Sequence, residues 1–475
     1  MSTRSTERVA PDPVVGGDDP YILSEDGIKE PPRSLGRSLR YLGPGLIVSA
    51  AIVGAGELIA TTALGAQVGF AILWLVVFST LVKVAIQVEF ARWIVSTGEP
   101  TLTGYNQVPP RIAGIGWVNL LWIVFALAKI LQTGGLVGTV AVAFSVLLPI
   151  GGDPMGFQSI LIWTIVVAAG IITGLYSNRY GLIEKVAFFL VALFSLVTIV
   201  IALGLPFTPF AYSSGDLLSG FSFTIPAGAL GAAVAMFGLT GVSVDEISSY
   251  PYWCVEKGYA RWIGPADGTE AWRRRAKGWI KVMYLDAFVS WIIYTLSTMA
   301  FFVMGASVLN PQGLAPEGEE MIVILSRIYT DTLGEWGSVV FLVGAIAVLG
   351  STLWAATPAW ARMYTNFLAV TGVLDWRNSA ARLRWIRAFT VALPLLWAIV
   401  YLFVQSPLVM VQIGGILGGV FLVAIVVVVW YLRKTQTDPQ LYGGGLFNVL
   451  LGISSLAIVL LGVYSVLEVF GVSIG

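Results

Sequence analysis

The chain alternates between long apolar stretches and short polar segments, and about eleven of these stretches are long enough to cross a bilayer. A transmembrane helix needs roughly 20 mainly apolar residues. The pattern therefore predicts an all-α integral membrane protein. The expected spans lie at about 44–66, 69–96, 114–149, 157–176, 181–204, 225–252, 282–308, 336–364, 385–404, 407–432 and 446–470.

The polar segments predict how the protein is oriented in the membrane. Residues 1–40 precede the first span and are expected to be a cytosolic tail that can be disordered, while residues 41–475 form the transmembrane domain. With the N-terminus inside, the inner loops hold most of the basic residues and the outer loops hold few. This asymmetry predicts a multi-pass protein of the cell membrane with its C-terminus outside. The basic residues of the inner loops include Arg111, Arg179, Arg273, Arg274, Arg275, Lys277, Lys281, Arg377, Arg382, Arg384, Arg387, Arg433 and Lys434.

Composition narrows the possible functions. Only 11% of residues are charged, against roughly 25% in soluble domains, and the formal net charge of zero gives no reason to expect a nucleic-acid partner. The single cysteine, Cys254, excludes an internal disulfide and a multi-cysteine metal cluster. The chain has no histidine, which removes the commonest transition-metal ligand and the usual proton shuttle.

Three carboxylates interrupt the apolar spans. Glu57 lies in the first span, and Asp245 and Glu246 lie in the sixth. An ionised group at this depth costs several kcal/mol, roughly 2.5–3.5 on insertion scales, and is kept mostly where it faces a cavity, a partner or a substrate. Glycines precede both acidic sites and favour local unwinding of the helix. The sequence therefore predicts a cation site beside two broken helices.

The positions of the two acidic spans predict an internal repeat. Five spans separate them, so they occupy equivalent places in two five-helix halves at about 44–204 and 225–432, with an extra helix at about 446–470. An odd number of helices per half inverts the second half relative to the first. We therefore expect an inverted 5+5 repeat with discontinuous helices 1 and 6, as in transporters that bind substrate at mid-membrane depth.

The expected metal ligands are all oxygen atoms. Unwinding would free the carbonyls of Gly54 and Ala55 in the first span and of Val242 in the sixth. Neighbouring residues of a regular helix point about 100° apart, which favours Asp245 as the direct ligand and leaves Glu246 as a second, water-mediated or pathway group. A divalent ion would offset repulsion between the acids. Oxygen ligands suit magnesium, manganese and calcium, and magnesium would keep several waters.

A structural explanation of the acids stays open. Glu57 could instead pair with a buried base such as Lys83 or Lys129. Two adjacent acids would need two such partners, which makes this explanation weaker for the sixth span.

The first two spans resemble a known family. They contain Gly43-Pro44-Gly45, Ser49, Gly54-Ala55-Gly56-Glu57, Gly65-Ala66, Leu73-Trp74, Ile86-Gln87 and Ser96-Thr97-Gly98, with Gln412 as a looser match in the tenth span. This series is similar to Nramp divalent-metal transporters over about 60 residues. The resemblance implies the leucine-transporter-like fold of the amino-acid/polyamine/organocation superfamily, with the metal held between helices 1 and 6.

The departures from the family pattern concern its metal and proton chemistry. The family's Asp-Pro-Gly-Asn falls on Gly54, Ala55, Gly56 and Glu57, and its Met-Pro-His falls on Asp245, Glu246 and Ile247. A hard carboxylate thus replaces the soft methionine, and the histidine is lost. The acidic pair of the third helix falls near Lys129 and Gln132. These changes resemble the Nramp-related magnesium transporters, which implies transport of magnesium and manganese uncoupled from protons.

Lys129 has two interpretations in this context. It pairs with Glu89 or Glu184 as a structural contact, or it is a fixed positive charge in place of a proton site. Glu89 itself is expected to pair with Arg92, three residues along the same helix.

The leading hypothesis is a secondary transporter or facilitator of hard divalent cations, with Glu57 and Asp245 binding the ion and Glu246 assisting. The ion is the substrate, no cofactor is expected, and the partners are the ion and the bilayer, with the protein a monomer. One alternative is a proton-coupled manganese or transition-metal transporter. Another is an ion-coupled organic-solute transporter, which would need a large apolar pocket. A membrane enzyme is disfavoured because no second aspartate is suitably placed.

Overall fold

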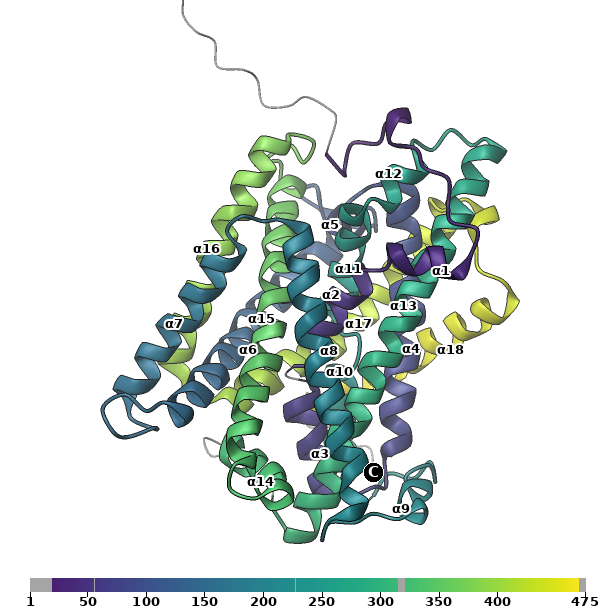
Figure 1. The fold of residues 1–475 in the computed structure, drawn as a ribbon. Coiled ribbons are helices and arrows are strands. Elements are labelled where there is room, and N and C mark those ends of the chain that lie inside the picture. Colours follow the sequence, from purple (N-terminus) through teal and green to yellow (C-terminus); the bar gives the residue numbers. More distant parts are fainter. Residues whose placement is uncertain (1–18, 55, 227, 315–320, 470–475) are drawn as a thin grey trace, which may run out of the picture.

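The computed structural model describes residues 19–54, 56–226, 228–314 and 321–469, and most of them are helical (Figure 1). A two-stranded antiparallel hairpin pairs Arg111 with Gly116. The helices and strands are α1 (Leu35–Ser38), α2 (Pro44–Ile52), α3 (Thr62–Val68), α4 (Leu73–Thr97), α5 (Thr101–Asn106), β1 (Arg111–Ile112), β2 (Ile115–Gly116), α6 (Trp117–Leu147), α7 (Phe157–Leu175), α8 (Tyr180–Gly204), α9 (Ser214–Ser219), α10 (Leu230–Leu239), α11 (Val244–Lys257), α12 (Tyr259–Ile263), α13 (Glu270–Met304), α14 (Met321–Leu333), α15 (Gly337–Val370), α16 (Ser379–Val404), α17 (Pro407–Thr435) and α18 (Gly445–Val469).

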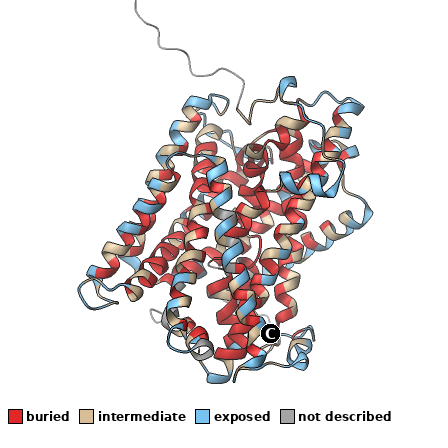
Figure 2. Ribbon diagram, in the orientation of Figure 1, coloured by how far each residue is buried: buried red, intermediate tan, exposed pale blue. Residues whose placement is uncertain are grey.

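The long helices match the expected spans. Within the described residues, eight helices are individually long and apolar enough to cross a membrane: α4, α6, α7, α13, α15, α16, α17 and α18. Helix α8, with 25 residues, takes the place of the fifth span, and the first and sixth spans are divided into shorter helices. Helices α7 and α16 lie at one edge of the molecule and expose much of their length, whereas α13 is largely enclosed (Figure 2).

Both predicted helix interruptions are present. In the first span, α2 ends at Ile52 and a π-helical turn over Gly56–Thr61 leads into α3. In the sixth span, four residues separate α10 from α11, and Gly241 among them has a φ of 62°. A residue with a Cβ is strained in that left-handed region, so glycine suits this break. The all-helical fold with discontinuous helices 1 and 6 is thus confirmed.

The start of α2 is fixed by a carboxylate from α13. Asp286 accepts hydrogen bonds from the backbone N–H groups of Gly43 (2.8 Å) and Gly45 (2.6 Å) and from the hydroxyl of Tyr250 (3.0 Å). The first N–H groups of a helix have no partner within the helix, and a negative charge there also favours the helix dipole. Asp286 therefore attaches the first half of the broken helix to its neighbour.

We expect Asp286→Asn to destabilise the protein without changing its shape. An amide NH₂ would face a backbone N–H, and charge-assisted bonds of this kind contribute about 1.5–3 kcal/mol each. Thermal unfolding in detergent, followed by tryptophan fluorescence, should show a midpoint several degrees lower. Asp267→Asn, at an exposed carboxylate, is the control and should unfold as the native protein does. An unchanged midpoint for Asp286→Asn would contradict this role.

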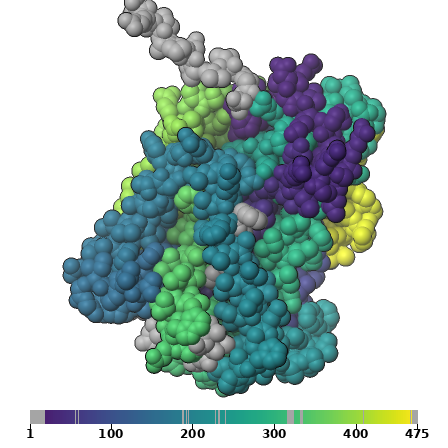
Figure 3. All heavy atoms as spheres, in the orientation of Figure 1, coloured from purple at the N-terminus to yellow at the C-terminus, as the bar shows by residue number. Residues whose placement is uncertain are grey.

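Residues 19–40 are not the free tail that the sequence suggested. The backbone N–H of Lys29 donates to the Trp262 carbonyl (3.0 Å), and the Trp279 indole donates to the Lys29 carbonyl (2.8 Å). Asp19 forms an ion pair with Arg382 at 2.6 Å. Figure 3 shows this purple N-terminal segment spread over the surface of teal segments. Aromatic and ionic contacts hold it there, and residues 1–18 of the expected tail lie outside the described part.

Two predicted loops contain helices instead. The basic run from Arg273 to Lys281 belongs to the first turns of α13, which begins at Glu270 rather than near residue 282. Arg273 pairs there with Asp438 at 2.8 Å. The hydropathy signal missed these turns because charged residues lower it, although they remain helical outside the hydrocarbon. The segment expected as the loop 309–335 contains α14.

Candidate functional site

A small cavity lies beside the two helix interruptions. Its volume is about 40 Å³, and five spans supply its walls. None of the described residues that line it carries sulfur. They are Ala51 and Ile52 at the end of α2, Phe125, Lys129, Gln132, Thr133 and Leu136 on α6, Gly238 on α10, Gly241 and Ser243 in the break, Asp245 and Glu246 on α11, Thr352 and Ala356 on α15, and Gly414, Gly415 and Gly418 on α17.

The first turn of α11 brings both of its acids to this cavity. Ser243 caps the helix: its N–H donates to Glu246 Oε2 (2.9 Å), and its hydroxyl contacts Asp245 Oδ1 (2.8 Å) and Glu246. Carboxylates in a first turn favour the helix dipole. The expectation that only one of the two acids can face the site is wrong. The 100° spacing does not separate them because both lie where the helix end itself borders the cavity.

Lys129 faces the same two acids from α6. Its ammonium lies 2.5 Å from Asp245 Oδ2 and donates to Gln132 Oε1 at 2.7 Å. The predicted pairing with Glu89 or Glu184 is therefore wrong, because those carboxylates have other partners. Glu89 pairs with Arg92 (3.0 Å), as expected, and also with Arg433 (2.6 Å), while Glu184 pairs with Lys257 (2.5 Å).

Glu57 joins the two broken helices. One of its oxygens, Oε1, accepts hydrogen bonds from the Gly241 N–H (2.8 Å) and from the Thr298 hydroxyl (3.1 Å). Its side chain is fully buried, and Oε2 has no hydrogen-bond partner among the described residues. A buried carboxylate oxygen without a partner is costly, so it marks a place where an ion or a proton would be stabilised.

Lys83 does not pair with Glu57, although the sequence left that open. Its ammonium instead donates to the carbonyls of Phe237 (2.6 Å) and Thr240 at the C-terminal end of α10. The corresponding end of α2 is held by α15, whose Thr352 hydroxyl contacts the Ala51 carbonyl at 3.1 Å. Side chains of neighbouring helices thus satisfy carbonyls that each interruption leaves without a helical partner.

The three carbonyls proposed as ligands have different outcomes. The Gly54 carbonyl accepts the Leu58 N–H at 3.0 Å, so it keeps the helix-type bond that it was expected to lose. Val242 lies fully buried in the sixth-span break. Ala55 lies outside the described residues. The π-helical turn explains the first result, because the chain continues to coil through the break instead of unwinding fully.

The acids do not converge on a single point. Within the described ranges, no group of three or more Asp, Glu or Cys side chains is arranged to hold a metal. Asp245 and Glu246 line the cavity, whereas Glu57 lies beyond its described lining and contacts it through Gly241.

The sequence interpretation missed two hydroxyl groups at this site. Thr298 and Thr352 sit within apolar helices, where a threonine often bonds only to its own backbone, so neither is distinctive in the sequence. Gln412, which the family resemblance included, is exposed and does not line the cavity.

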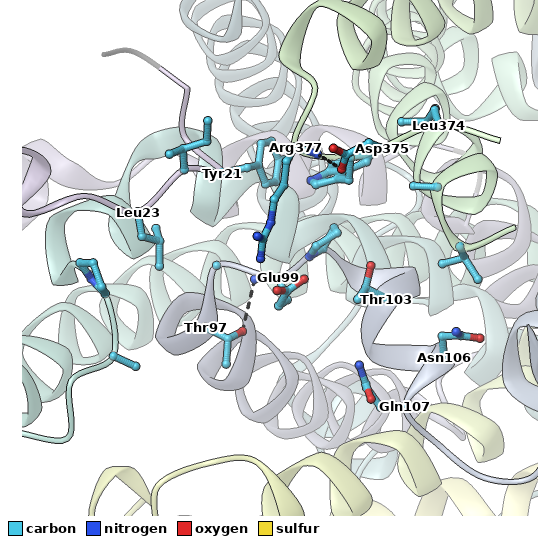
Figure 4. A pocket seen from close by; sticks show the side chains of 18 of the residues that line it. Tyr21, Leu23, Thr97, Glu99, Thr103, Asn106, Gln107, Leu374, Asp375 and Arg377 are labelled. Carbon is cyan, nitrogen blue, oxygen red and sulfur yellow. Dashed lines mark hydrogen bonds between the residues drawn. The ribbon is translucent and has the colours of Figure 1, made fainter. Parts of the chain in front are cut away.

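A second, larger cavity lies at the face that carries the N-terminal segment. It measures about 840 Å³, and Tyr21, Glu99, Asp375 and Arg377 are among the side chains around it (Figure 4). These residues come from the N-terminal segment and from the ends of α4 and α15. Several titratable groups point into it, but none of the three membrane acids lines it.

Comparison with known proteins identifies the family. The family described as natural resistance-associated macrophage protein-like, Nramp, matches residues 45–468. An uncharacterized protein of Pasteurella multocida is 21% identical over 66% of this chain and 67% of its own length. The divalent metal cation transporter MntH of Mycobacterium tuberculosis is 30% identical over 28% of this chain, a stretch that spans 31% of that transporter.

A solved structure supports the same fold. The manganese transporter of Eremococcus coleocola superposes with a TM-score of 0.66 at 14% identity, covering 96% of this chain and 92% of that one. At such identity the likeness concerns the fold alone. Because the family match extends from the start of α2 into α18, across both broken helices, this chain is a multi-pass membrane protein that belongs to the Nramp family.

Proposed function

We propose that the protein is a secondary transporter or facilitator of hard divalent cations, chiefly Mg²⁺ and also Mn²⁺, that is not coupled to protons. The observation that carries this proposal is the pair Asp245 and Glu246 on a cavity without sulfur or imidazole. Carboxylate, hydroxyl and carbonyl oxygens are the ligands of magnesium and manganese, whereas softer metals are selected by thioether and thiolate ligands.

The size of the cavity favours an ion over an organic substrate. A volume of about 40 Å³ holds roughly three water-sized particles. Sites for drug-sized organic ligands measure roughly 300–1,000 Å³ and are mainly apolar. A magnesium ion that keeps part of its water shell fits the observed space, and Mg²⁺ gives up its waters reluctantly. This contrast argues against the organic-solute alternative.

We assign the direct contacts to Asp245 and Glu57, with Glu246 assisting. Asp245 presents an oxygen to the cavity, and Glu57 offers its unpartnered Oε2 once the break around Gly241 adjusts. The carbonyls of Gly54, Ala55 and Val242 remain further candidates. Gly54 still has one lone pair available, because a carbonyl oxygen can accept two bonds.

The proton-coupled alternative is disfavoured by the groups around the cavity. Transport of a proton requires a side chain that gains and loses it during the cycle, and histidine is the usual group. This chain has no histidine, and α6 presents Lys129 and Gln132 to the cavity. We further propose that the protein is a monomer in the cell membrane with the N-terminus in the cytoplasm and the C-terminus outside, as the basic loops predict.

Uptake by purified protein in proteoliposomes tests this function. We expect saturable Mg²⁺ and Mn²⁺ uptake, with half-saturation between micromolar and millimolar concentrations, at equal rates with and without a pH gradient. Protein-free vesicles are the control. Uptake that rises with the gradient, together with acidification of the lumen, would support the proton-coupled alternative. The absence of any Mg²⁺ or Mn²⁺ uptake would overturn the proposal.

A further inference from the structure

We infer that Lys129 is a tethered cation that occupies the binding site between transport events and is displaced from Asp245 by the incoming divalent ion. This inference rests on the proposed function and concerns how the empty site is neutralised. It goes beyond a fixed positive charge, because it requires the ammonium group to exchange places with the substrate.

The geometry places Lys129 where the substrate would bind. Its ammonium lies 2.5 Å from Asp245 Oδ2, and both side chains line the small cavity. The exposed fractions of the two side chains are 8% and 14%, so the pair is largely shielded from solvent. An ion that binds Asp245 on the cavity side therefore meets a carboxylate that already holds a cation.

Lys129 also has a place to go when the ion arrives. Gln132, one turn further along α6, accepts its ammonium at 2.7 Å, and the Phe125 ring lies 5.8 Å away, within cation–π range. Lysine has four rotatable side-chain carbons and a compact charge, so a small rotation moves the ammonium from Asp245 toward these two groups. The rest of the site can stay in position during this exchange.

The charge balance of the site gives the exchange a purpose. With every group ionised, Glu57, Asp245 and Glu246 face Lys83 and Lys129, which leaves one net negative charge. A bound divalent ion changes this to one net positive charge. Without Lys129 the empty site would carry two uncompensated negative charges in the membrane interior, where an unpaired charge is costly.

A transporter must return its empty site across the membrane to work repeatedly. Alternating access moves the same helices with and without substrate, and a large charge on either form slows that step. Lys129 keeps the charge of the empty form small, at the expense of affinity for the ion. We therefore expect it to weaken binding and to accelerate the return.

Lys83 does not share this role. Its ammonium is held by the Phe237 and Thr240 carbonyls at the end of α10 and does not line the cavity. Moving it would leave two buried carbonyls without a donor. Only Lys129 combines a carboxylate partner in the cavity with alternative acceptors on its own helix.

The test is Lys129→Gln, with Mg²⁺ binding measured by calorimetry and transport measured as both net uptake and Mg²⁺ exchange. Net uptake needs the empty site to return, whereas exchange does not. We expect binding to tighten about tenfold and net uptake to slow about tenfold, while exchange stays within about twofold of the native rate. Lys257→Gln is the matched control, because it breaks a lysine–carboxylate pair of the same 2.5 Å length away from the cavity.

Lys129→Arg keeps the charge and tests the inference in the opposite direction. A guanidinium can grip Asp245 with two hydrogen bonds and is harder to displace, so we expect weaker Mg²⁺ binding with the native ratio of net uptake to exchange. This variant also serves if Lys129→Gln does not fold. Binding unchanged in the folded variants, or an equal loss of net uptake and exchange in Lys129→Gln, would mean that the pair is only structural and would overturn the inference. If the native protein neither binds nor transports Mg²⁺ or Mn²⁺, the proposed function itself fails.

Discussion

Replacing Asp245 with asparagine is expected to reduce saturable Mg²⁺ uptake by at least about 100-fold. Asparagine has nearly the same size and can still accept the Ser243 hydroxyl, so α11 should keep its start. The change removes a carboxylate from the cavity and leaves the Lys129 ammonium without its anionic partner. A divalent ion would then meet an uncompensated positive charge, which repels it strongly in a site shielded from water.

The effect of Asp245→Asn should be measured in two ways. Uptake into proteoliposomes reports transport, and the Mg²⁺-dependent rise in the unfolding midpoint reports binding. Glu184→Gln is a matched control, because it also breaks a lysine–carboxylate pair at 2.5 Å but lies outside the cavity. We expect this control to transport normally. Uptake within about twofold of native in Asp245→Asn would rule out Asp245 as a ligand.

Substitution of Glu57 should separate its ionic role from its structural one. Glu57→Ala leaves the buried Gly241 N–H without an acceptor, at a cost of about 1–3 kcal/mol, and should both unfold earlier and lose uptake. Glu57→Gln retains an amide oxygen for Gly241 and Thr298 but removes the charge at Oε2. We expect it to remain nearly as stable as the native protein and to lose most of its uptake.

The comparison of the two Glu57 variants decides between the hypotheses for this residue. Thr298 keeps a second partner, the Tyr294 carbonyl at 2.7 Å, so the loss in Glu57→Ala falls mainly on Gly241. Thermal unfolding and uptake are measured on the same preparations. Normal uptake by Glu57→Gln would show that Glu57 only connects the two broken helices.

Much of the fold was predictable because its signals are local. Apolar length defines each span, and glycines next to an acid indicate where a helix breaks, as at Gly54 and Gly241. The spacing of the two acidic spans predicts the repeat. The pair Glu89–Arg92 was also predictable, because residues three apart share one face of a helix.

The contacts between distant residues were not predictable in the same way. Asp245 and Lys129 are 116 positions apart, and their pairing depends on how α6 packs against the broken sixth span. The sequence contained several other acids that Lys129 could have met. The packing of residues 19–40 likewise depends on a surface formed by α12 and α13, which composition alone does not indicate.

The sequence by itself determined that this is a membrane protein with two interrupted helices and three buried acids, because transfer free energies and helix periodicity act over short stretches of chain. Only the tertiary structure decided how those acids are used. It placed Asp245 and Glu246 together on the cavity, engaged one oxygen of Glu57 with Gly241, and brought Lys129 to Asp245. Such pairings depend on the angle and register at which helices pack, and these are set by side chains that lie far apart in the chain.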